Sequence, residues 1–129
     1  MAEINSHRDL VAWQKAYELG KLMYRLTASF PESERFGLTS QLRRGGVSVA
    51  SNIAEGYGRA SSSDYLRFLR VARGALFEID TQVSFARDLG FMNDDGYVQA
   101  DSLARECGRV LAGLIRSIEK NIESRTSEH

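Results

Sequence analysis

The chain of 129 residues contains a single proline, Pro31. Proline breaks α-helices more strongly than any other residue, because it lacks a backbone donor and its ring clashes with the preceding turn. A chain almost free of proline can therefore form long uninterrupted helices. No segment alternates with the period of a half-buried strand, and no dipeptide indicates a hairpin. The sequence predicts an all-α protein.

Local start and stop patterns divide the chain into four expected helices. Pro31 ends the first, and the glycines Gly56 and Gly58, which suit a left-handed cap, end the second. Ser61 followed by Asp64 is a capping-box pattern at the start of the third. The expected helices cover about residues 9–30, 38–56, 61–89 and 93–121.

Short connections make consecutive helices antiparallel. The expected fold is thus an antiparallel up-down-up-down four-helix bundle, with residues 1–122 as one domain. The polar residues 123–129 are expected to form a disordered C-terminal tail.

Charge is unevenly placed, although 17 basic and 17 acidic side chains give a net charge of zero. Residues 35–73 hold seven arginines and two acids, whereas residues 74–104 hold six acids and one arginine. Arginine is suited to bidentate contact with phosphate. The candidate nucleic-acid-binding residues are Arg43, Arg44, Arg59, Arg67, Arg70 and Arg73.

Two interpretations of this basic stretch remain open. The arginines could contact the phosphates of RNA or DNA. They could instead pair with acids such as Asp80 and Asp88, or with acids on a partner, which would make the protein an interaction scaffold.

The first expected helix has two adjacent apolar stripes, one more than a single bundle core requires. The second stripe contains Trp13, Tyr17 and Tyr24. This aromatic row either lies half-exposed along a groove of its own bundle or contacts another subunit. We take the subunit interface as the prediction.

A polar stripe runs along the second expected helix and includes Asn52 and Glu55. It fits a solvated face, a buried polar network at a subunit interface, or a small ligand site. Asn52 and Glu55 are therefore further candidate interface residues. Beside them, Gly45 and Gly46 weaken the helix unless another helix approaches closely.

The sequence lacks the usual patterns of catalysis and metal binding. It has no Walker A, HExxH, nucleophile-elbow or CxxC pattern, and its two histidines lie near opposite ends. Cys107, the single cysteine, is expected to be a small core hydrophobe. We expect no enzyme, cofactor, metal or membrane span, and a cytoplasmic location.

Several blocks of the chain resemble a known family. They are Asp9–Ala16, Phe30-Pro31, Phe36–Arg44, Val47–Arg59, Tyr65–Leu69 and Glu78–Gln82. Together they are similar to the four-helix-bundle proteins encoded in intervening sequences of bacterial 23S rRNA genes, the S23-like family. The accessory variability protein of diversity-generating retroelements is a relative. The resemblance implies a homopentameric ring with a central channel, and nucleic-acid binding.

Overall fold

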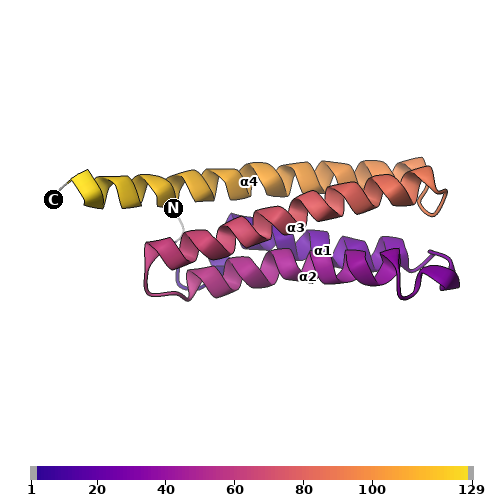
Figure 1. Cartoon of the computed structure of the whole chain (residues 1–129), viewed down its shortest axis with the longest axis horizontal. Helices are drawn as coiled ribbons and strands as arrows, with labels where there is room; N and C mark the ends of the chain where they lie inside the picture. The colour runs from indigo at the N-terminus through magenta and orange to yellow at the C-terminus, as the bar shows by residue number, and fades with distance from the viewer. Residues whose placement is uncertain (1–2, 128–129) are drawn as a thin grey trace.

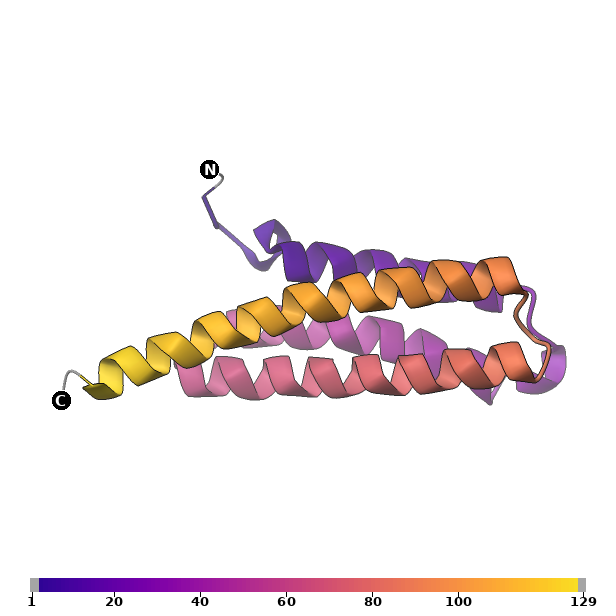
Figure 2. The ribbon, with the colours of Figure 1, turned by 90° about the horizontal axis from the view of Figure 1, so that it is seen from above.

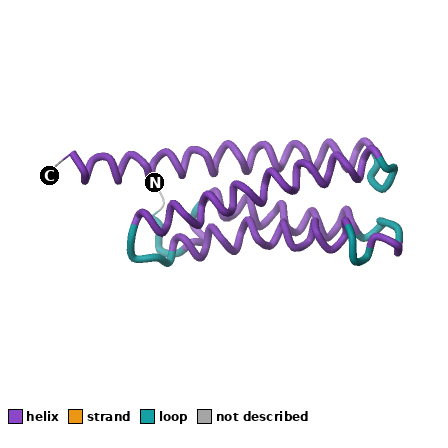
Figure 3. The backbone as a smooth tube through the Cα atoms, in the orientation of Figure 1, coloured by secondary structure: helices purple, strands orange, loops and turns teal. Residues whose placement is uncertain are grey.

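The computed structural model describes residues 3–127, which form four long helices (Figure 1). The helices are α1 (Val11–Thr27), α2 (Leu38–Tyr57), α3 (Ser62–Asp88) and α4 (Asp94–Ser127). Short 3₁₀ turns, His7–Asp9 and Glu32–Glu34, precede α1 and α2. Within the described residues there is no strand (Figure 3). The predicted all-α four-helix fold is confirmed.

The four helices pack in a square arrangement. Contacts join α1 to α2, α2 to α3 and α3 to α4, and α4 also packs against α1. Consecutive helices run in opposite directions (Figures 1 and 2). Thus α1 lies diagonally across the bundle from α3. The last turns of α4 project beyond the ends of the other three helices in both views.

One apolar core runs along the centre of the bundle. Each helix contributes side chains that are fully buried, and the largest of them are Leu19, Met23, Leu42, Ile53, Leu69, Ile79 and Leu111. Burying one such side chain contributes about 1.5–3 kcal/mol. Cys107 is fully buried among them, as the sequence predicted.

The helix ends differ from the predictions at three places. First, α1 ends at Thr27 rather than at residue 30, and the Thr27 hydroxyl donates to the carbonyl of Met23. Second, Gly58 at the end of α2 is right-handed, with φ −78°, so the predicted left-handed cap is wrong. Among the described residues, only Gly90 has a positive φ, 81°.

The third difference concerns the C-terminus, where α4 continues to Ser127. The predicted disordered tail is therefore wrong over residues 123–127, and residues 128–129 lie outside the described part of the chain. The sequence after Gly113 contains neither glycine nor proline, so nothing local ends the helix there.

Candidate interaction surfaces

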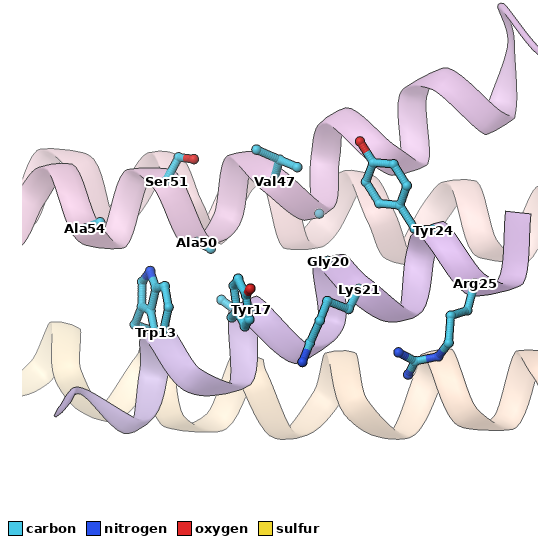
Figure 4. Close-up of a pocket in the computed structure, with 12 residues that line it drawn as sticks. Trp13, Tyr17, Gly20, Lys21, Tyr24, Arg25, Val47, Ala50, Ser51 and Ala54 are labelled. Carbon is cyan, nitrogen blue, oxygen red and sulfur yellow. The ribbon is translucent and has the colours of Figure 1, made fainter. Parts of the chain in front are cut away.

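The aromatic row of α1 lines an open groove of about 620 Å³ between α1 and α2, which we call the α1/α2 groove. Figure 4 shows this row beside the small residues of α2 that form the other wall. The groove is lined by Trp13, Ala16, Tyr17, Gly20, Lys21, Tyr24, Arg25, Gly46, Val47, Ala50, Ser51 and Ala54. Large residues on one wall and small residues on the other leave space that an apolar side chain from outside can fill.

The rings of the row are held in place by contacts within the chain. Trp13 stacks on Tyr17 with ring centroids 4.9 Å apart. The rings of His7 and Trp13 pack edge to face, with centroids 5.1 Å apart. The ammonium of Lys21 lies 4.8 Å from the centroid of the Tyr17 ring. Tyr17 and Tyr24 nevertheless keep 47% and 49% of their surface exposed. The row is thus a preformed apolar surface open to solvent.

Asn52 and Glu55 do not join this groove. Asn52 donates from Nδ2 to the carbonyl of Ser48 at 2.8 Å and to its hydroxyl at 3.1 Å. Glu55 is exposed and pairs with Arg59 one turn away. Both lie on the neighbouring strip of α2, where contacts within the helix engage the Asn52 amide nitrogen and the Glu55 carboxylate. Their predicted interface role stays a prediction.

Within residues 3–127, three of the six candidate arginines form ion pairs with acids of the same chain. The pairs are Arg59 with Glu55, Arg67 with Asp64, and Arg70 with Glu119. The acids used are therefore not Asp80 or Asp88, the two that the sequence suggested. All of these side chains are exposed by more than a third, so each pair contributes little to stability.

Arg59 and Arg67 meet at one aromatic ring near the turn that connects α2 and α3. Their guanidinium carbons lie 4.6 Å and 4.4 Å from the centroid of the Phe68 ring. The third helix begins beside them at the N-cap Ser61, whose hydroxyl accepts from the backbone N–H of Asp64 at 3.1 Å. This cap fixes the turn, and the ring fixes the two cations next to it.

The other three candidate arginines lie apart from that pair. Arg43 donates from Nε to the Thr27 hydroxyl at 2.9 Å and lies over the ring of Tyr24, so it belongs to the α1/α2 side. Arg44 lines one hollow together with Arg43 and a second hollow between α2 and α3. Arg73 lines a hollow between α3 and α4. The six arginines are therefore distributed over three sides of the bundle.

The structure also exposes apolar residues that the sequence analysis did not single out. Phe77, Phe85 and Leu89, at and just beyond the C-terminal half of α3, are 67%, 58% and 58% exposed. They line a hollow of about 630 Å³ with Leu38 and other residues of α2. The signal was present in the sequence, because all three fall outside the core stripe of that helix.

Burial makes Cys107 chemically inert. Its removal from water, with a smaller effect of the Glu106 charge, raises the pKa of the thiol to about 12. The thiol is therefore protonated at neutral pH and is a poor nucleophile. No group of three or more His, Cys, Asp or Glu side chains among residues 3–127 could hold a metal ion. Nor does any helix in that range combine the length and apolar character needed to cross a bilayer.

The fold and its surfaces define a four-helix bundle with an apolar groove on one face and distributed arginines. Comparison with known proteins then identifies the family. The model of the 23S rRNA-intervening sequence protein family matches residues 8–113, so the chain belongs to that family.

A solved structure shows the same fold. It is a protein of unknown function from the S23 ribosomal protein family of Bacteroides thetaiotaomicron, with a TM-score of 0.73 and 20% identity. The match covers 81% of this chain and 98% of that one. The search of curated proteins found no match.

Proposed function

We propose that this protein assembles with copies of itself into a ring and binds nucleic-acid phosphates through its arginines, without catalysis. The pentameric number is taken from the family resemblance. The proposed location is the cytoplasm, since a single cysteine fits a reducing compartment.

The observation that carries the binding proposal is the placement of Arg59 and Arg67 over Phe68. A guanidinium held on a ring is already ordered, so less rotamer entropy is lost when it contacts a phosphate. Arg70 follows one turn later on α3. Three cations at one end of the bundle can thus engage successive phosphates of an RNA or DNA backbone.

The ion pairs of these arginines do not oppose the proposal. Exposed pairs of this kind are worth about 0–1 kcal/mol, so a phosphate can displace the carboxylate at little cost. In a ring, the same three cations repeat once per subunit. Binding that is weak for one copy then becomes stronger through the combined contacts of several.

The test is a salt titration of binding to a structured RNA and to duplex DNA. The wild type is compared with Arg67→Glu/Arg70→Glu, and the matched control is Arg87→Glu/Arg105→Glu. Both variants lower the net charge by four, since each replacement removes one positive charge and adds one negative. Only the first alters the proposed site.

We expect wild-type binding to weaken linearly in log salt, with a slope of about 0.7–0.9 for each phosphate contact. The Arg67/Arg70 variant should lose binding, and the control should keep most of it. Equal losses in the two variants would point to overall charge rather than to this site. No binding at about 50 mM salt, where such contacts are strongest, would overturn the proposal.

The second candidate is a protein-interaction scaffold, and one observation favours it. Arg70 already pairs with Glu119 across two helices, at 3.1 Å, which shows that these arginines accept carboxylates as partners. Acids on a protein partner could take the same place. Intact assembly without nucleic-acid binding would favour this candidate.

A further inference from the structure

Phe77, Phe85 and Leu89 form an exposed apolar ridge along α3 and its C-terminal end, here called the α3 ridge. Such a group of large apolar side chains is unfavourable in water and commonly marks an interaction site.

The α3 ridge and the α1/α2 groove lie on separate parts of the bundle surface. The helix that carries the ridge lies diagonally opposite α1, and the ridge hollow shares no lining residue with the α1/α2 groove. One copy can therefore use both surfaces at the same time.

The charges around the two surfaces are opposite in sign. Among the described residues that line the groove there are two cations, Lys21 and Arg25, and no acid. Lys21 also pairs at 3.0 Å with Glu18, which lies outside the lining, so Arg25 is the lining cation for which no ion pair within the described residues is seen. Around the ridge hollow, the described lining residues include two acids, Glu34 and Glu78, and no cation. Charge of one sign on each surface opposes contact between two grooves or between two ridges. It favours contact of a groove with a ridge.

The aromatic row of α1 and the α3 ridge also have similar lengths. Along α1 the aromatic row extends from Trp13 to Tyr24, which is about 16 Å at 1.5 Å per residue. Along α3 the ridge extends from Phe77 to Leu89, about 18 Å. The groove has small residues, such as Ala50 and Ala54, on one wall, where bulky side chains can enter.

We infer that the α1/α2 groove is occupied by the α3 ridge of a second copy of this chain. This inference rests on the proposed self-assembly and specifies its interface. Because the two surfaces differ, every pair of copies that docks leaves one groove and one ridge free. Such head-to-tail contacts close into a ring when the rotation between copies allows it.

The experiment uses two variants that each remove one surface. The groove variant is Tyr17→Glu/Tyr24→Glu, and the ridge variant is Phe77→Glu/Phe85→Glu. All four side chains are exposed, so circular dichroism should remain that of the wild type. The control is Val98→Glu, at a position on α4 that is 60% exposed and lies outside both surfaces. Mass is measured by light scattering, for each protein alone and for an equimolar mixture of the two variants.

We expect the wild type and the control to assemble, and each variant alone to have the mass of one copy, 14.4 kDa. The mixture should contain a complex of twice that mass. In it, the intact groove of the ridge variant binds the intact ridge of the groove variant. Neither copy can extend the complex further, so growth stops at the pair.

Other outcomes overturn the inference in distinguishable ways. A ridge variant with wild-type mass would show that the groove has another occupant, while self-assembly itself would stand. A monomeric wild type would overturn the proposed assembly together with its interface. A mixture that stays monomeric would exclude the groove-to-ridge contact.

A charge exchange tests the same contact while all the apolar side chains of the two surfaces are kept. Lys21→Glu should weaken assembly, and so should Glu78→Lys, because each variant places like charges on the two contacting surfaces. An equimolar mixture of these two variants should recover much of the assembly. Where the two variants alternate, the altered groove of one meets the altered ridge of the other, and their unaltered surfaces meet as in the wild type. A ring of five copies keeps one contact between two copies of the same variant, so we expect a ring less stable than that of the wild type. No recovery, with both single variants weakened, would contradict the assigned pairing.

Discussion

A Cβ atom built on Gly46 would lie 2.8 Å from the Cα of Gly20, so the backbones of α1 and α2 touch where these two glycines meet. Real Cβ atoms do not approach so closely, and only glycine fits. The sequence analysis expected a close helix approach to explain the mid-helix glycines, and this contact confirms it for Gly46. It also explains the groove, because the same small residues form its floor.

The first prediction concerns this contact. Gly46→Ala should lower the free energy of unfolding by about 1–3 kcal/mol, because the new methyl group pushes α1 and α2 apart. Urea denaturation monitored by circular dichroism gives the value. The matched control is Gly74→Ala in the middle of α3, where a Cβ has nothing within 4 Å. There alanine should stabilise by about 0.5–1 kcal/mol, through its better helix propensity. A neutral Gly46→Ala would show that the helices separate easily.

Most of the fold could be predicted from the sequence because its determinants are local. Pro31, the N-cap Ser61 and the apolar periodicity each act within a few residues, and all four helices were found from them. The end of α4 was missed for the same reason. A polar sequence without glycine or proline resembles a tail, yet nothing in it interrupts the helix.

The candidate surfaces could be predicted only in part. The aromatic row followed from the width of the apolar arc on one helix, which is a local property. The pairing of Arg70 with Glu119 joins positions 49 residues apart, and no local pattern reveals it. The six arginines looked like one patch because they are close in sequence. Their division among three sides of the bundle depends on how α1 to α4 pack.

The second prediction concerns pH. The pKa of the Cys107 thiol is raised from 9.0 to about 12 by burial. Above pH 9 the unfolded chain releases this proton while the folded chain keeps it. The stabilisation is therefore complete below pH 9 and decreases as the pH rises toward 12, by about 1.4 kcal/mol per unit.

Cys107→Ala should accordingly show a shallower loss of unfolding free energy between about pH 9 and pH 10.5. Slopes are compared rather than absolute values, because the smaller side chain also leaves a gap in the core. Tyr65, whose pKa is likewise raised to about 12 by burial, contributes a slope of the same sign in both proteins. Identical slopes in the two proteins would mean that the thiol ionises without unfolding.

The third prediction concerns the start of α3. Ser61→Ala removes the hydroxyl that accepts from the Asp64 backbone N–H, and should lower stability by about 1 kcal/mol. Ser63→Ala, at an exposed position two residues later, is the control and should change little. The same cap orders the turn that carries Arg59. Ser61→Ala should therefore also weaken nucleic-acid binding, if the proposed site is correct.

The fourth prediction separates stability from binding at Arg70. The pair of Arg70 Nη2 with Glu119 Oε2 spans 3.1 Å, with side chains 51% and 43% exposed. Arg70→Glu should therefore lower the free energy of unfolding by no more than about 1 kcal/mol, and adding Glu119→Arg should restore it. Urea denaturation of the two single variants and the double variant measures this.

The double variant has the wild-type net charge but carries the arginine on α4 instead of α3. If the phosphate contact depends on Arg70 beside Arg67, nucleic-acid affinity at about 50 mM salt should stay reduced although stability recovers. Full recovery of affinity would mean that the binding surface senses total charge and extends onto α4. In that case Arg70 would be one cation among several rather than part of a defined site.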